Sequence, residues 1–145
     1  MQLNDLLERL QLDAASPKKR VLVVEDHLDL LVRLRRILVG LGHEVTDLVG
    51  AEVIEGKPCW IEGRFQSGHR ELIELSGFDA ALLDHYFVSS SMNGHVLTQE
   101  LVRVGVGRIL AMSSDAGANA RMSKAGAQIA LRKNIVLSLV QTDPK

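Results

Sequence analysis

The sequence predicts an α/β fold built on a parallel β-sheet, and three features of the chain support this class. Short apolar runs such as Val21–Val24 are typical of strands that are buried on both faces of a sheet. Between these runs, apolar residues recur every three or four positions, which predicts amphipathic helices. From Arg20 onward strand and helix alternate five times, and this alternation favours parallel strand pairing.

The composition is that of an ordinary globular protein, and its 145 residues suffice for one domain with a proper core. The formal net charge of −1 gives no electrostatic case for a nucleic-acid partner. The single cysteine, Cys59, excludes an intrachain disulfide and fits a reducing compartment. No apolar run approaches the roughly 20 residues that span a bilayer, and charged residues interrupt residues 1–12, unlike a signal peptide. We therefore expect a cytoplasmic protein without a nucleic-acid or membrane partner.

The first 19 residues are predicted to form a helix and a linker that precede the main domain. Leucines at helical spacing occupy residues 3–12, and Ser16-Pro17 is typical of a linker. A helix of about ten residues is marginal alone in water, so this one must pack on the domain or on a partner.

The main domain, residues 20–141, contains the remaining elements in chain order. Strands are predicted at residues 21–24, 44–49, 79–83, 108–112 and 127–131, and helices at 28–41, 67–75, 94–104, 118–125 and 135–140. Residues 50–66 form an insert that is longer than an ordinary strand–helix connection of about 2–6 residues. Because this insert carries Trp60, Ile61 and Phe65, we interpret it as a protein-contact element.

Polar residues follow the predicted strands at the points where those strands end. Glu25 and Asp26 follow the first strand, Asp84 the third, Ser113 the fourth and Lys133 the fifth. The carboxyl ends of parallel strands form one rim, where ligands bind. Three neighbouring carboxylates repel one another unless a cation lies among them, and oxygen ligands favour Mg²⁺. A carboxylate beside such an ion can accept a phosphoryl group, whose oxygens the hydroxyl and the ammonium would contact.

Five segments, in this order, resemble the receiver domains of two-component signalling. They are Val21–Asp26, Phe78–Asp84, Asn93-Gly94, Ile109–Ser113 and Gly126–Lys133. The resemblance covers about residues 20–141. It implies a flavodoxin-like, doubly wound, five-stranded parallel sheet of strand order 2-1-3-4-5 in a three-layer αβα arrangement.

The resemblance also implies a role for each residue of the predicted site. Asp84 would be the phosphoacceptor, Ser113 the switch hydroxyl and Lys133 the lysine that contacts the phosphoryl group. The implied magnesium ligands are Asp26 directly, Glu25 largely through water, Asp84, and the backbone carbonyl of Tyr86. The chain departs from the family at Asn134, where proline is usual, and at Ala130, where an aromatic residue is common.

The resemblance implies a response regulator that accepts a phosphoryl group from a histidine kinase or a phosphotransfer protein within a phosphorelay. Such a protein is a self-phosphorylating phosphoacceptor with autodephosphorylation rather than a conventional enzyme. The chain ends twelve residues after Lys133, so we expect a stand-alone receiver that signals by contacts with a downstream protein. Homodimer formation stays open.

Competing functions can be compared on the same residues. A dinucleotide-binding domain would need glycines after the first strand, and Glu25–Leu28 contains none. A phosphatase of the haloacid-dehalogenase type would need a second acid at the position of Tyr86. The remaining alternative is a receiver-like protein-binding module that is not phosphorylated, which Ala130, Asn134 and the insert favour.

Overall fold

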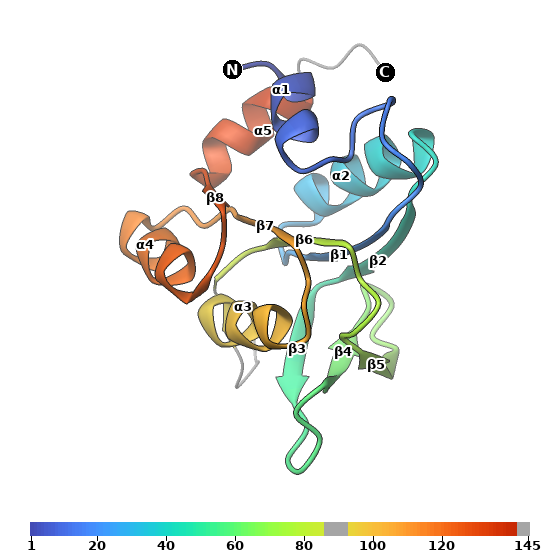
Figure 1. Cartoon of the computed structure of the whole chain (residues 1–145), viewed down its shortest axis with the longest axis vertical. Coiled ribbons are helices and arrows are strands. Elements are labelled where there is room, and N and C mark those ends of the chain that lie inside the picture. Colours follow the sequence, from blue (N-terminus) through green and yellow to red (C-terminus); the bar gives the residue numbers. More distant parts are fainter. Residues whose placement is uncertain (86–92, 142–145) are drawn as a thin grey trace.

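The computed structural model describes residues 1–85 and 93–141, which contain two β-sheets and five helices (Figure 1). The larger sheet has five parallel strands in the order β2-β1-β6-β7-β8. These strands are β1 (Arg20–Val24), β2 (Glu44–Leu48), β6 (Ala80–Leu83), β7 (Arg108–Ala111) and β8 (Ile129–Ala130). Counted along this sheet alone the order is 2-1-3-4-5, so the predicted flavodoxin-like topology is confirmed.

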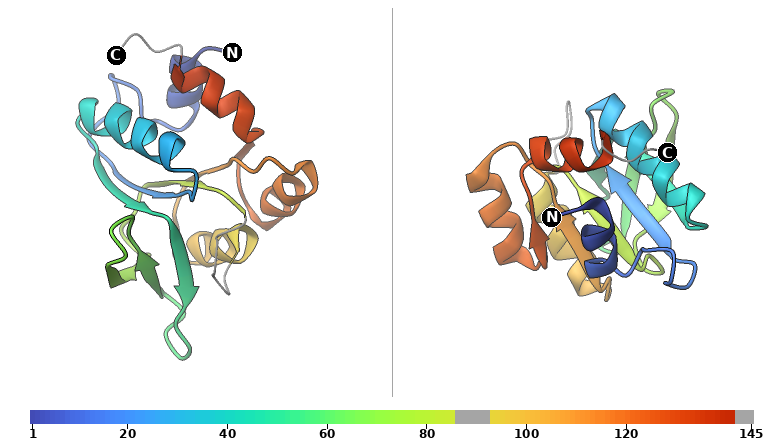
Figure 2. Two further views of the ribbon diagram at one scale, coloured as in Figure 1. Left: turned by 180° about the vertical axis from the view of Figure 1, so that it is seen from behind. Right: turned by 90° about the horizontal axis from the view of Figure 1, so that it is seen from above.

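Helices cover both faces of the parallel sheet (Figures 1 and 2). They are α1 (Leu3–Arg9), α2 (Leu28–Gly40), α3 (Gly94–Arg103), α4 (Ala116–Ala125) and α5 (Lys133–Gln141). Helices α1, α2 and α5 contribute to the apolar cluster on one face, and α3 and α4 to the cluster on the other. The layered arrangement predicted from the sequence is therefore present.

The unbroken apolar run of β1 is explained by these two clusters. Successive side chains of a strand point to opposite faces, so Val21 and Val23 enter the cluster with α2 and α5. Leu22 and Val24 enter the cluster with α3 on the opposite face. All four side chains are fully buried, which is why no polar residue alternates with them.

The helix predicted at residues 67–75 is wrong, because this segment contains a strand. Residues 50–74 form a small antiparallel sheet of β3 (Gly50–Val53), β4 (Trp60–Arg64) and β5 (Arg70–Glu74). A turn precedes β5: Gly68 has a φ of +91°, and the Phe65 N–H donates to the carbonyl of His69 at 2.9 Å. Apolar residues at Leu72, Ile73 and Leu75 match both helical and strand periods, so their spacing could not distinguish the two.

The small sheet takes the place of a helix between the second and third strands of the parallel sheet. Ala51 of β3 and Ile61 of β4 are buried in the same cluster as Leu22, Leu97 and Leu101. One outer layer of the molecule therefore consists of α3, α4 and this sheet. The predicted insert, residues 50–66, supplies β3 and β4 and continues through β5.

The N-terminal segment packs on the domain. Leu6, Leu7, Leu10 and Leu12 belong to the cluster that contains α2 and α5. The buried ring of His43 fixes both ends of the linker, since its Nε2 donates to the carbonyl of Leu12 at 2.7 Å while its Nδ1 accepts the Lys19 N–H at 3.1 Å. Among the described residues, no helix combines the length and apolar character needed to cross a membrane.

Candidate functional site

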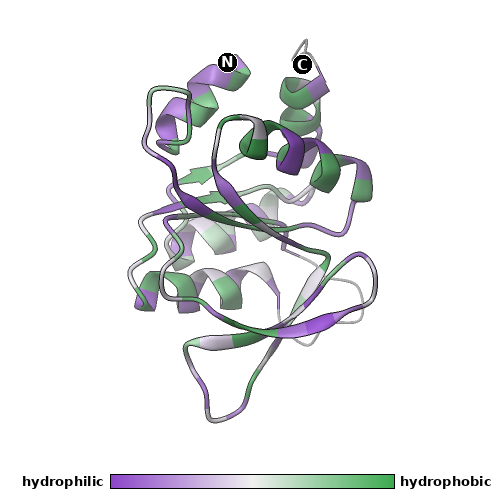
Figure 3. Ribbon diagram, turned by 90° about the vertical axis from the view of Figure 1, so that its right-hand side faces the viewer, coloured by the Kyte–Doolittle hydropathy of each residue, from purple (hydrophilic) through white to green (hydrophobic). Residues whose placement is uncertain are grey.

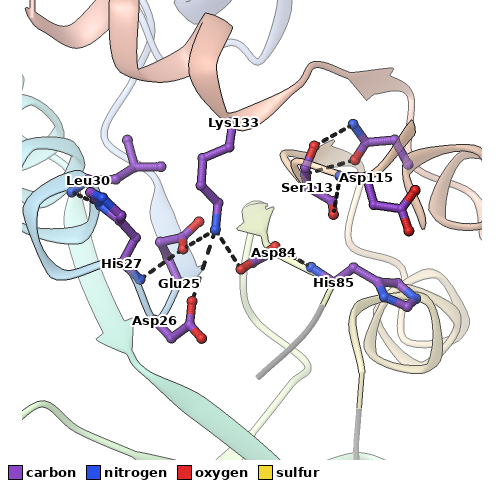
Figure 4. A network of polar contacts seen from close by, with 10 residues as sticks. Glu25, Asp26, His27, Leu30, Asp84, His85, Ser113, Asp115 and Lys133 are labelled. Carbon is purple, nitrogen blue, oxygen red and sulfur yellow. Dashed lines mark hydrogen bonds and ion pairs between the residues drawn. The ribbon is translucent and has the colours of Figure 1, made fainter. Parts of the chain in front are cut away.

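The structure brings four of the predicted site residues together at the carboxyl ends of the parallel strands (Figure 4). Glu25 and Asp26 follow β1, Asp84 follows β6, and Lys133 is the first residue of α5. The Lys133 Nζ lies 2.8 Å from Glu25 Oε2, 2.8 Å from Asp84 Oδ2 and 4.0 Å from Asp26 Oδ1. One ammonium therefore faces three carboxylates.

The three carboxylates lie close enough to share a cation. One oxygen of each of Glu25, Asp26 and Asp84 lies within 4.8 Å of the others. Glu25 is fully buried; its Oε2 accepts the His27 N–H at 3.0 Å, whereas its Oε1 has no hydrogen-bond partner among the described residues. Such a buried, unpaired carboxylate oxygen is costly unless a cation or water contacts it.

The charge balance of the site also favours a cation. Burial, reinforced by the negative charge of Asp84, raises the pKa of Glu25 to about 8, although Lys133 opposes this shift. Burial alone would lower the pKa of Lys133, but its hydrogen bonds to Asp84 and Glu25 and the negative charges of both acids together outweigh burial and raise that pKa. The raised pKa of Glu25 means that Lys133 alone does not stabilise the ionised form of this acid fully, and a bound cation would favour that form.

These residues fit Mg²⁺, which prefers carboxylate oxygens and keeps part of its water shell. Asp26 is the most exposed of the three acids, with 26% of its side chain accessible, so the site can be entered from solvent. The ion would be held by Glu25, Asp26 and Asp84. The predicted fourth ligand, the backbone carbonyl of Tyr86, lies outside the described residues.

Ser113 lies at the end of β7, on the side of Asp84 opposite to Glu25 (Figure 4). It is buried, and its Oγ accepts the Asp115 N–H at 3.2 Å. Its hydroxyl is thus held by the turn that begins α4, and no hydrogen bond joins it to Asp84 within the described part of the chain.

Asn119 of α4 fixes this turn and was not predicted from the sequence. Its buried side chain accepts the Ser113 N–H at 2.8 Å and donates to the carbonyls of Ser113 at 3.0 Å and Leu131 at 3.1 Å. Asn119 therefore joins the ends of β7 and β8, and with them the segments that carry Ser113 and Lys133. An asparagine within a run of alanines in a helix was the available signal.

The Asn93-Gly94 pair has a steric explanation. Asn93 caps α3 by accepting the Val96 N–H at 3.2 Å, and Gly94 N–H donates to the carbonyl of His85 at 2.7 Å. A Cβ at Gly94 would collide with the backbone of Asp84 and His85, so only glycine permits this approach. Helix α3 thus begins directly against the segment that follows β6.

His85 occupies the space beside Asp84. Its N–H donates to Asp84 Oδ1 at 2.7 Å, and its ring stacks on His95 of α3 with 5.4 Å between centroids. Burial lowers the pKa of His85, which favours the neutral form of its ring. The other oxygen of Asp84 bonds Lys133, and the carboxylate is therefore held from both sides.

Comparison with known proteins gives similarity at the level of structure only. No family model matches the sequence, and no curated protein matches it. A putative response regulator from Chloroflexus aurantiacus J-10-fl is 19% identical, with a TM-score of 0.55 over 86% of this chain and 93% of that one. A CheY-like response regulator receiver domain protein from Methanospirillum hungatei JF-1 is 21% identical, with a TM-score of 0.50 over 86% and 92%.

The chain also matches part of a larger protein. NtrX from Brucella abortus is 14% identical with a TM-score of 0.56, and the match covers 86% of this chain but only 26% of NtrX. The chain thus spans about a quarter of that protein. The strand order and the matched structures agree, and the chain has the fold of response-regulator receiver domains.

Proposed function

We propose that the chain is a phosphoacceptor of two-component signalling and that Asp84 accepts the phosphoryl group. The observation that carries this proposal is the position of Lys133 Nζ, 2.8 Å from Asp84 Oδ2, beside the carboxylates of Glu25 and Asp26. A nucleophile, a cation-binding pair of acids and a phosphate-binding ammonium are the parts that phosphoryl transfer to a carboxylate requires.

The transfer begins when an oxygen of the Asp84 carboxylate attacks the phosphorus of a phosphohistidine. A P–O bond to Asp84 forms, the P–N bond of the donor breaks, and the histidine nitrogen recovers its electron pair. In the unphosphorylated structure Lys133 contacts Asp84 and Glu25. During transfer its ammonium would contact the phosphoryl oxygens. Bound Mg²⁺ supplies neutralisation of the negative charge on the phosphoryl oxygens.

Loss of the phosphoryl group returns Asp84 to its starting state. A water oxygen attacks phosphorus, the bond from phosphorus to the Asp84 oxygen breaks, and inorganic phosphate leaves. Ser113 would donate a hydrogen bond to a phosphoryl oxygen in the phosphorylated state. Its Oγ accepts the Asp115 N–H at 3.2 Å, and this bond leaves the hydroxyl hydrogen available for donation.

The donor in this proposal is a histidine kinase or a phosphotransfer protein, and the output is contact with a downstream protein. Support comes from the receiver-type fold together with the identities of Asp84, Asp26, Glu25 and Lys133 at the carboxyl ends of the strands. This combination, rather than the fold alone, favours phosphotransfer, because a fold can be retained without its chemistry.

A second candidate is a receiver-like binding module that is never phosphorylated. Ala130, exposed on β8, has no ring that could follow a change at Ser113. The small sheet also replaces a helix that would otherwise cover the parallel sheet. Both features concern signal output, and neither removes a group from the site.

One experiment separates the two candidates. The protein is incubated with Mg²⁺ and acetyl phosphate, and the product is reduced with borohydride, which converts an acyl phosphate to an alcohol. Peptide mass analysis should then find homoserine in place of Asp84. Unmodified Asp84 in a folded sample that retains Mg²⁺ binding supports the binding module instead.

A further inference from the structure

We propose that β5 is a self-association strand, which pairs in antiparallel fashion with β5 of a second copy of this chain around Leu72. The proposal concerns the small sheet and does not depend on phosphorylation of Asp84. The two copies would be related by a twofold axis, so that each contributes the same residues to the contact.

The outer edge of β5 is free to pair. Strand β5 is the last strand of the small sheet, and within residues 1–85 and 93–141 it pairs only with β4. The Leu75 N–H donates to the carbonyl of Cys59 at 2.8 Å, so Leu75 faces β4. Because alternate residues of an antiparallel strand face opposite edges, Ile73 and Glu71 also face β4. Arg70, Leu72 and Glu74 therefore present their N–H and C=O groups to the outer edge.

Solvent reaches this edge. A groove of about 550 Å³ runs between β5 and β2, the edge strand of the parallel sheet. Its lining includes Glu71–Glu74 of β5, Val45–Asp47 of β2, and the rings of Phe65 and Phe78. Figure 3 views the side of the molecule on which β5 lies in Figure 1, and hydrophilic and hydrophobic segments alternate there.

The order of residues along β5 makes the strand complementary to itself. Its sequence is Arg-Glu-Leu-Ile-Glu, from Arg70 to Glu74. When Leu72 of one copy lies opposite Leu72 of the other, Arg70 lies opposite Glu74 at both ends of the contact. These three residues are also the ones whose backbone groups point outward. Side-chain charge and backbone hydrogen bonding therefore specify the same register.

Neighbouring registers lack this match. A shift of two residues in one direction places Glu71 opposite Glu71 of the partner, which brings like charges together. A shift in the other direction places Leu72 opposite Glu74 and removes both Arg–Glu pairs. Charged side chains normally protect an edge strand from pairing, because a second strand would place like charges, or charges without a partner, next to one another. On β5 the symmetric register pairs Arg70 with Glu74 at both ends, and Glu71 lies opposite the uncharged Ile73.

The contact would also cover an exposed apolar side chain. Leu72 has 52% of its surface accessible, the highest value among the large apolar side chains inside a helix or strand whose burial the structure describes. In the proposed register the two Leu72 side chains meet at the twofold axis, flanked by the ion pairs. A contact of one strand per copy is small, so the expected dimer is weak and depends on concentration.

Sedimentation equilibrium over a wide concentration range tests the proposal with two single variants of the full chain. Arg70→Glu places two negative charges opposite each other at both ends, and Glu74→Arg places two positive charges there. Each variant alone should dimerise at least about tenfold more weakly than the native chain. Mixed in equal amounts, the two variants should form a heterodimer of native strength, because each Glu then faces an Arg.

The mixing experiment also separates pairing from effects within one chain. Arg70 has an ion pair with Glu62 of its own chain at 3.1 Å, and Arg70→Glu breaks this pair in the mixture as well as alone. Glu55→Lys, an exposed charge reversal in the β3–β4 connection, serves as the matched control and should leave dimerisation unchanged. A native chain that stays monomeric throughout, or variants that fail to restore association when mixed, would overturn the proposal.

Discussion

Lys133 and Asp84 are 49 residues apart in the sequence, yet their side chains meet at 2.8 Å between Nζ and Oδ2. The same Nζ lies 2.8 Å from Glu25 Oε2, so a single ammonium joins the ends of β1 and β6 to the start of α5. All three side chains are largely removed from water. The contact therefore supports the fold and at the same time holds the proposed phosphoacceptor.

Replacing Lys133 with methionine should destabilise the protein by about 3 kcal/mol, because two buried carboxylates lose their partner. Urea unfolding without divalent cations measures this loss. Lys124→Met, on the exposed side of α4, is the matched control and should change stability little. Adding Mg²⁺ should reduce the difference in the free energy of unfolding between the native chain and the Lys133→Met variant, since a cation can replace the lost positive charge. Equal stabilities of the Lys133 and Lys124 variants would contradict this account.

Magnesium should stabilise the native chain, because an ion bound only by the folded state raises its stability by mass action. At a free Mg²⁺ concentration about ten times the dissociation constant, the free energy of unfolding should rise by about 1.4 kcal/mol. Thermal melting with and without Mg²⁺ measures it. Asp26→Asn should abolish the shift, whereas Asp29→Asn, at an exposed residue in the first turn of α2, should retain it. A shift that survives Asp26→Asn would place the ion elsewhere.

Asn119→Ala should lower the free energy of unfolding by about 2 to 3 kcal/mol, because it removes two buried hydrogen bonds and one partly buried hydrogen bond to the ends of β7 and β8. The Ser113 N–H would lose its acceptor, so its hydrogen exchange should quicken more than that of the neighbouring strand. Ser123→Ala, exposed on the same helix, is the control. If Ser113 exchange were unchanged in the Asn119 variant, Asn119 would have no part in positioning it.

The small sheet should behave as part of the folding unit. Ile61 is 1% exposed and packs in the cluster beneath the parallel sheet, so Ile61→Ala should cost about 3 kcal/mol. The milder Ile61→Val should cost about 1 kcal/mol. Ile135→Ala, at a side chain that is 44% exposed, is the control and should cost less than either. A neutral Ile61→Ala would mean that the sheet is an independent appendage.

The parallel sheet could be predicted from the sequence because its strands are buried on both faces. Val21–Val24 and Ala80–Leu83 are unbroken apolar runs, and only a central strand needs such a run. The small sheet could not be predicted in the same way. Its strands are short and half exposed, and the apolar spacing of Leu72 and Ile73 fits a helix as well as a strand. These strands are specified instead by turns such as Ser67-Gly68 and by pairing with β4.

The polar residues of the site were predictable because topology alone brings them together. Glu25, Asp26, Asp84 and Lys133 each follow a strand of one parallel sheet, so their meeting requires only the strand order. Asn119 was not predictable by this argument, because it acts from the middle of a helix on the backbone of two loops. The orientation of Ser113 toward Asp115 likewise depends on the local turn, which strand patterns do not specify.

The central claim, that Asp84 accepts a phosphoryl group, is tested most directly by intact-mass analysis after incubation with acetyl phosphate. The native chain should gain the mass of one phosphoryl group in the presence of Mg²⁺ and lose it again after the acetyl phosphate is removed and the ion is retained. Asp84→Asn should gain nothing, while Asp79→Asn, an exposed acid just before β6, should match the native chain. Equal phosphate on the Asp84→Asn chain, or none on the native chain with Mg²⁺ bound, would contradict the account.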